Sequence, residues 1–164
     1  MRRWIAGITL CAALLFAPGA WALPERAGDW SSDREDVTQF ILEADSGDMG
    51  QWTRRLYTRE SPGAAVEANL MEGPGPGPLR IPESVGSYDA VMEAKSEYRI
   101  LEVAGRRAVL ERGPLLPLAL TVSLGKNRTL TLEGHVTEEE LTGLAVQFIG
   151  ILDNMANTEN LEER

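Results

Sequence analysis

Residues 98–155 hold the pattern that most constrains the fold, with strand-like alternation first and helix-like periodicity after it. Segments 98–103 and 106–112 flank Ala104-Gly105, and segments 118–124 and 128–133 flank a turn at 125–127. These two pairs predict β-hairpins, because Gly and Asn tolerate the positive φ of tight turns. The second hairpin should have one buried face, which carries Leu118, Leu120, Val122, Leu124, Leu130 and Leu132.

The next segment predicts an amphipathic helix that begins at Thr137. Thr137 and Glu140 have the spacing of a capping box, and Glu138, Glu139 and Glu140 occupy the first turn, where the helix dipole favours acids. Apolar residues then recur with helical spacing: Leu141, Leu144, Ala145, Phe148, Ile151, Leu152 and Met155. The predicted fold class is α+β, an antiparallel sheet of about six strands with this helix packed on the apolar face of the second hairpin.

The first half of the chain gives weaker patterns. Residues 51–59 and 64–71 predict a hairpin around a turn that contains Pro62-Gly63. Residues 32–44 predict a helix, because Ser32 and Glu35 resemble a capping box, although the run TQFIL leaves a strand open. Residues 88–95 predict either a short helix or the beginning of a strand that continues to Val103.

Alternating Gly and Pro at 73–78 exclude a helix or a central strand there, and we expect a loop that extends to residue 87. Neither side of this loop has enough apolar pattern for a separate core, so the chain should form one domain over residues 37–156. Residues 23–36 are expected to be a mobile N-terminal segment, and residues 157–164 a disordered tail.

The first 22 residues resemble a secretory signal peptide, with Arg2 and Arg3 before an apolar run and the sequence Ala20-Trp21-Ala22 after it. The apolar run is too short for a bilayer span, so we expect cleavage after Ala22 and no stable membrane span afterwards. The mature chain would then be periplasmic or secreted. Whether cleavage takes place is left open by the sequence.

Composition limits the partners and the chemistry. The net charge is −9 and would become −11 without Arg2 and Arg3, which argues against a nucleic-acid partner. The only cysteine, Cys11, lies in the predicted signal peptide, so a mature chain would have no disulfide or thiolate site. The acidic turn at 45–50 matches only fragments of a calcium loop, and we predict no metal and no cofactor.

Catalytic motifs are missing from the sequence: there is no G-x-S-x-G, H-E-x-x-H or C-x-x-C. The only histidine, His135, precedes the predicted helix cap, and a polar residue in a strand-to-helix turn is the simpler interpretation. We therefore assign no catalytic residue.

A ligand or partner surface is predicted around the strand at 51–59. Its candidate residues are Trp52, Arg54, Arg55, Tyr57, Arg59 and Tyr88. Strand alternation places Trp52 and Arg54 on one face and Arg55, Tyr57 and Arg59 on the other. Such a set suits an anion, a carbohydrate or a partner protein, and the alternative is that the arginines only pair with the abundant acids.

Residues 98–155 resemble PsbP-like domains, and equally the uncharacterised C-terminal domains of bacterial exported or membrane-anchored proteins. The resemblance rests on Val103, Gly105 and Ala108 in the first hairpin and on a helix opening with Thr137, Glu139, Glu140 and Leu141. It implies an antiparallel sheet flanked by helices in a small accessory or binding protein, without shared catalytic residues.

The function expected from the sequence is that of a non-enzymatic, periplasmic accessory or binding protein of bacterial type. Its partner would be an unknown protein or a small ligand of the cell envelope, and its oligomeric state is left open. Two alternatives remain: a small exported hydrolase with an Asp, Glu and Ser-based site, and a structural subunit of an envelope complex.

Overall fold

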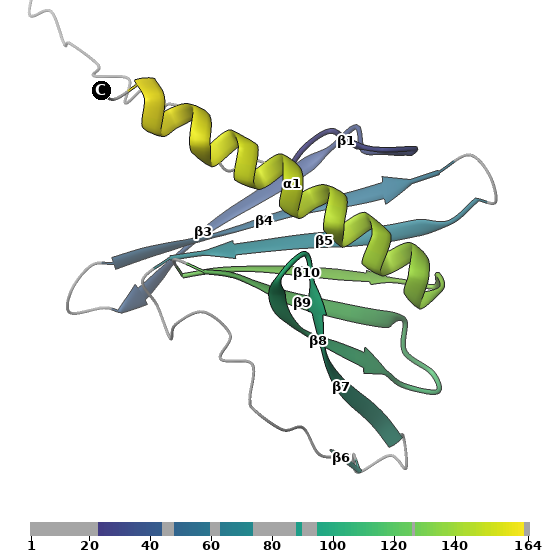
Figure 1. The fold of residues 1–164 in the computed structure, drawn as a ribbon. Coiled ribbons are helices and arrows are strands. Elements are labelled where there is room, and N and C mark those ends of the chain that lie inside the picture. The colour runs from purple at the N-terminus through teal and green to yellow at the C-terminus, as the bar shows by residue number, and fades with distance from the viewer. Residues whose placement is uncertain are drawn as a thin grey trace, which may run out of the picture.

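A computed structural model describes residues 23–43, 48–59, 63–73, 88–89, 95–125 and 127–162. The predicted signal peptide, the Gly-Pro loop from residue 74 and residues 45–47 of the acidic turn lie outside these residues. Residues 48–50, expected to belong to that turn, form the beginning of a strand. The described chain forms a large, curved antiparallel sheet with one long helix lying diagonally across one face, so the fold is α+β (Figure 1). We call the helix-covered face the inner face and the opposite one the outer face.

The described residues contain ten strands in this sheet, more than the six or so predicted. The order along the sheet is β1-β2-β4-β5-β10-β9-β8-β7-β6, and β3 pairs with β4. Their bounds are β1 Arg26–Ala27, β2 Trp30–Ser31, β3 Glu35–Glu43, β4 Asp48–Thr58, β5 Ala65–Glu72, β6 Tyr88–Asp89, β7 Lys95–Val103, β8 Arg106–Arg112, β9 Leu118–Gly125 and β10 Arg128–Gly134.

All three predicted hairpins are present, as β4–β5, β7–β8 and β9–β10. Their turns use positive φ as predicted, for example at Ala104 (48°) and Gly105 (73°) and again at Gly125 (73°) and Asn127 (61°). A non-local pairing completes the sheet, because β10 pairs along its whole length with β5. That pairing joins the first half of the chain to the second.

The helix α1 spans Glu138–Glu162 and begins with the predicted capping box. The Glu140 backbone N–H donates to Thr137 Oγ1 at 3.2 Å, and the Thr137 backbone N–H donates to Glu140 Oε2 at 2.9 Å. This backbone hydrogen bond, together with Arg59, lowers the pKa of Glu140 to about 2. The helix continues beyond residue 156, so the prediction of a disordered tail is wrong for residues 157–162.

The core lies between α1 and the inner face, as predicted. Leu120, Val122, Leu130 and Leu132 on the sheet are buried against the helical stripe. The fully buried helical residues are Leu141, Leu144, Ala145, Phe148 and Leu152, and Ile149 adds to them. At the centre of this core the rings of Tyr57 and Phe148 make an edge contact, with centroids 4.9 Å apart.

The predicted helix at 32–44 is wrong, since residues 35–43 form β3. Ser32 donates its hydroxyl hydrogen bond to the Arg34 carbonyl at 3.1 Å, whereas the Glu35 carboxylate accepts from Arg55 Nε at 3.0 Å. The apparent capping box therefore does not form. Pairing of β3 with β4 supplies a backbone partner that the local sequence does not reveal.

Residues 23–36 belong to the packed domain instead of forming a mobile segment outside it. Leu23, Ala27 and Trp30 are buried in the core, and β1 and β2 form a small hairpin against α1. The turn between them needs Gly28, which has φ +62°, and a Cβ there would lie 2.5 Å from Gln147 Oε1 on the helix. The domain thus begins at Leu23 in the described chain.

We expect Tyr57→Phe to lower the free energy of unfolding by about 1 kcal/mol. The buried Tyr57 hydroxyl donates to the Pro24 carbonyl at 2.5 Å, and its loss would leave that carbonyl without this partner. Chemical denaturation measures the effect. The matched control is Tyr98→Phe, whose hydroxyl donates to Glu111 on the less enclosed outer face, and an equal loss in both variants would contradict the assignment.

Candidate functional site

The outer face of β4 and β5 is the candidate site, because it gathers exposed apolar and charged side chains where no described helix covers the sheet (Figure 1). Trp52, Leu56 and Met71 are 39%, 55% and 49% exposed. Strand alternation explains their position, since Thr53, Arg55 and Tyr57 point inward and are buried. We call Trp52, Arg54, Leu56, Glu67, Asn69 and Met71 the β4–β5 outer surface.

The register between the two strands sets the neighbours on this surface. Trp52 lies opposite Met71, Arg54 opposite Asn69, and Leu56 opposite Glu67. Trp52 Nε1 donates to Asn69 Oδ1 at 2.9 Å, and Asn69 Nδ2 donates to Glu67 Oε1 at 3.1 Å. This chain of hydrogen bonds fixes the indole orientation and leaves its ring available for contact.

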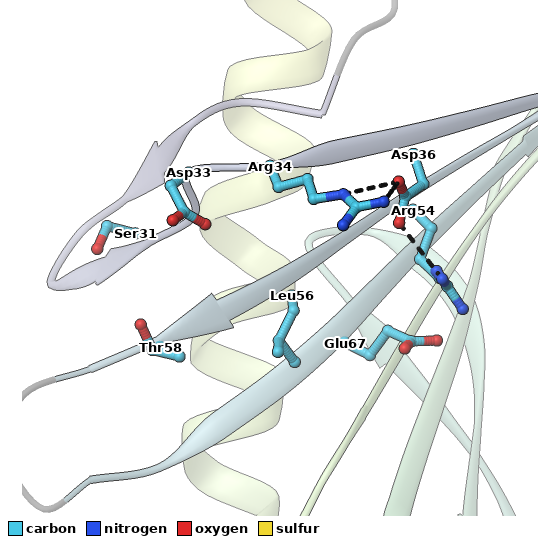
Figure 2. Close-up of a pocket in the computed structure, with 8 residues that line it drawn as sticks. All are labelled: Ser31, Asp33, Arg34, Asp36, Arg54, Leu56, Thr58 and Glu67. Atoms are coloured by element: carbon cyan, nitrogen blue, oxygen red, sulfur yellow. Dashed lines mark hydrogen bonds and ion pairs between the residues drawn. The ribbon is translucent and has the colours of Figure 1, made fainter.

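A groove runs beside this surface, between the outer face of β4 and the segment that joins β2 to β3 (Figure 2). Its volume is about 600 Å³. The lining combines hydroxyls, both signs of charge and one aliphatic side chain: Ser31, Asp33, Arg34, Asp36, Arg54, Leu56, Thr58 and Glu67. Such a lining suits a polar, elongated ligand with some apolar content better than a compact apolar molecule.

Asp36 organises the charges at one end of the groove. Its carboxylate accepts from Arg34 Nε at 3.0 Å and from Arg54 Nη2 at 3.3 Å (Figure 2). These two hydrogen bonds, that from Arg34 first, hold the pKa of Asp36 below its usual range. One carboxylate therefore orients two guanidinium groups, and Arg34 and Arg54 remain exposed enough to meet a ligand.

The structure divides the predicted site residues among four places, one of which is occupied by Arg59 alone. Trp52 and Arg54 lie on the β4–β5 outer surface, as their alternation predicted. Arg55 and Tyr57 face inward, where Tyr57 is fully buried and Arg55 pairs with Glu35. Tyr88 is in β6, beyond β7 at the opposite edge of the sheet. The predicted set is therefore not one surface.

Arg59 has a structural environment of its own. Its guanidinium lies 4.8 Å from the Trp30 ring centroid and pairs with Glu140 of α1 and, at 3.6 Å, with Asp29. It thereby joins the end of β4 to the β1–β2 hairpin and to the first turn of α1. The alternative interpretation, in which the arginines pair with acids, describes Arg55 and Arg59 well.

His135 lies in a shallow cleft where β8 and β10 end and where β9 and α1 begin. The only carboxylate among the residues that line this cleft in the described chain is Glu138, which already pairs with Arg99 and Arg112. Asp153, further along α1, pairs with Arg106 and lies roughly 22 Å from Glu138 along the helix axis. This arrangement does not place two free carboxylates beside His135.

Five residues of the site were absent from the predicted set: Asp36, Leu56, Glu67, Asn69 and Met71. Alternation along residues 64–71 would have placed the last three on one face. Their position beside Trp52 and Arg54 depends on the register of β4 with β5, and Asp36 depends on the register of β3 with β4.

Two further properties concern the described residues alone. They contain no group of three or more His, Cys, Asp or Glu residues arranged to hold a metal ion. The helix of the described chain lacks the apolar length needed to cross a membrane.

Comparison with protein-family models, with curated proteins and with solved structures gives no match for this chain. The resemblance to PsbP-like domains accordingly stays a prediction.

The half-buried acid Glu72 makes the stability of the domain depend on pH. Burial raises the pKa of Glu72 to about 7, although the neighbouring Arg128 acts in the opposite direction. A raised pKa of an acid means that folding favours the protonated form. The stability from this residue is therefore present below about pH 4.5 and lost as the pH rises through about 7.

We expect Glu72→Gln to remove this loss, which is on the order of 1 kcal/mol after allowance for partial exposure of the side chain. Denaturation midpoints measured from pH 4.5 to 8 test it, with Glu97→Gln on an exposed site as control. An unchanged slope of stability against pH in Glu72→Gln would contradict the assignment.

Proposed function

We propose that this protein is a non-enzymatic accessory protein of the bacterial cell envelope that binds a basic polypeptide segment through the β4–β5 outer surface. The observation that carries the proposal is the grouping of Trp52, Leu56 and Met71, all well exposed, around Arg54 on an open sheet face. Tryptophan, methionine and arginine are enriched in protein interfaces, and grouped apolar exposure of this kind is typical of interaction sites.

Charge on the same face favours a basic partner. The register of β5 with β10 places Glu67 directly opposite Glu133, and neither takes part in an ion pair within the described chain. Like charges at directly opposite positions destabilise a sheet. A lysine or arginine of the partner would relieve that repulsion, and the net charge of −9 acts in the same sense at longer range.

The hydrolase alternative has less support from the arrangement of side chains. His135 is exposed, and the neighbouring Glu138 is engaged by two arginines. The groove beside β4, in contrast, contains paired and oriented charges suited to recognition. The location of the protein in the cell envelope is part of the proposal, and it is supported by the predicted signal peptide at residues 1–22.

Site-specific photo-crosslinking in intact cells tests the proposal. A photoreactive phenylalanine at Leu56 should give one discrete adduct, whose crosslinked peptide contains lysine or arginine. The matched control replaces Val146, which is 45% exposed on α1 and far from the outer face. Absence of an adduct at Leu56, equal adducts at both positions, or an adduct that is not a polypeptide would contradict the proposal.

The Glu67–Glu133 pair gives a second test. Residues kept for binding commonly reduce the stability of the fold, so removal of this repulsion should stabilise the domain and weaken binding. Glu133→Lys should raise the free energy of unfolding by about 0.5 kcal/mol, since it replaces repulsion with attraction, and it should lower the yield of the Leu56 adduct several-fold.

The control for this pair is Glu102→Lys, which has the same change in net charge but lies opposite Arg107. It should lower stability and leave the Leu56 adduct unchanged. Loss of the adduct in both variants would show that only net charge matters, and loss in neither would remove the pair from the binding surface.

A further inference from the structure

The edge strand β3 lies next to the β4–β5 outer surface and is paired on one side only in the described part of the chain. Its residues 35–43 pair with β4, and β2 precedes it along the same side of β4 (Figure 1). Nine residues of edge strand present a row of backbone N–H and C=O groups to any extended chain that approaches.

The register of β3 shifts between Ile41 and Glu43, and its charged residues lie at its two ends. Between those ends, the strand lacks the sequence features by which natural edge strands avoid pairing. Residues 37–42 read VTQFIL, with no proline and no charged residue. At the opposite edge of the described sheet, β7 pairs with the two-residue β6 only through Lys95 and Ser96. It reads KSEYRILEV, and its four charged residues leave no uncharged run longer than two residues. Of the two edges, β3 is therefore the one suited to accept another strand.

We infer that β3 receives an extended strand of the partner polypeptide, which pairs antiparallel or parallel with its free side and adds to the sheet. This deepens the proposed function and rests on it for the polypeptide nature of the ligand. The added strand would lie roughly 10 Å from β4, at two strand spacings, so side chains of the same ligand could reach Arg54 and Trp52.

Charge argues for a partner and against a second copy of this chain. Antiparallel pairing of two β3 strands over their full length is centred on Gln39 and sets Glu35 of one copy opposite Glu43 of the other, twice. Such like-charge pairs are destabilising. In addition, the sequence of β3 has acidic residues at both ends and no basic residue, so its ends favour lysine or arginine in the incoming strand.

The test uses a fluorescent peptide, acetyl-Lys-Thr-Val-Thr-Val-Thr-Val-Lys-amide, with the mature chain. A control peptide with proline in place of each valine has the same charge but cannot form the ladder. We expect the first peptide to bind at least tenfold more tightly and to slow backbone amide exchange in residues 37–42 but not in β7. Gln39→Lys, which places a charge on the edge, should abolish this difference.

Four results would overturn the inference: no binding of the first peptide, equal affinity for both peptides, protection of β7 in place of β3, or a dimer in light scattering whose β3 amides are protected without peptide. The Leu56 crosslink distinguishes failure of strand addition alone from failure of the proposed function. If only strand addition is wrong, the adduct persists in Gln39→Lys; if the function is wrong, no adduct forms in either chain.

Discussion

The packing of α1 on one face of the sheet is the interaction on which the rest of the structure depends. An antiparallel sheet that is covered by a single helix has one buried face and one exposed face. On each strand, the side chains alternate between these two faces. The apolar stripe of the helix meets the inner rows of β5, β9 and β10. Ion pairs from Arg59, Arg106 and Arg112 to acids of α1 then fix where along the sheet the helix lies.

This division also decides what each arginine near β4 does. Arg55 and Arg59 reach inward or toward the helix, where their charges are matched and their contacts hold β3, the N-terminal hairpin and α1 together. Arg54, one position from Arg55, points outward, and a single shared carboxylate leaves it accessible. Neighbouring residues of one strand thus point to opposite faces. Arg55 stabilises the fold, whereas Arg54 is available for the binding that we propose.

The sequence predicted well those parts of the fold in which partners are close along the chain. The hairpins of residues 95–134 and the capping box at Thr137 follow from turn chemistry and periodicity, and both are present. The elements that depend on distant partners were missed. Strand β3 needs β4 to reveal it, and the two-residue strands that hold Ala27 and Trp30 are too short for any periodic pattern.

The candidate site, like the fold, was predicted where it depends on local alternation and was missed where it depends on partners distant along the chain. Alternation along 51–59 correctly separated Trp52 and Arg54 from Arg55 and Tyr57. The surface around them comes from strand register, which brings Asn69, Met71 and Glu133 into neighbouring rows. The inclusion of Tyr88 was a consequence of residue type alone, since β6 is at the opposite edge.

We propose that, within residues 52–58 of β4, the exposed even-numbered positions serve binding and the buried odd-numbered positions stabilise the fold. It is tested most directly by single cysteine substitutions at residues 52–58, in a Cys11→Ala background, labelled with a maleimide. We expect fast labelling at 52, 54, 56 and 58 and slow labelling at 53, 55 and 57 in the purified protein. In intact cells, a bound partner should protect the fast positions 52, 54 and 56. Uniform labelling along β4, or labelling that is identical in cells and in the purified protein, would contradict it.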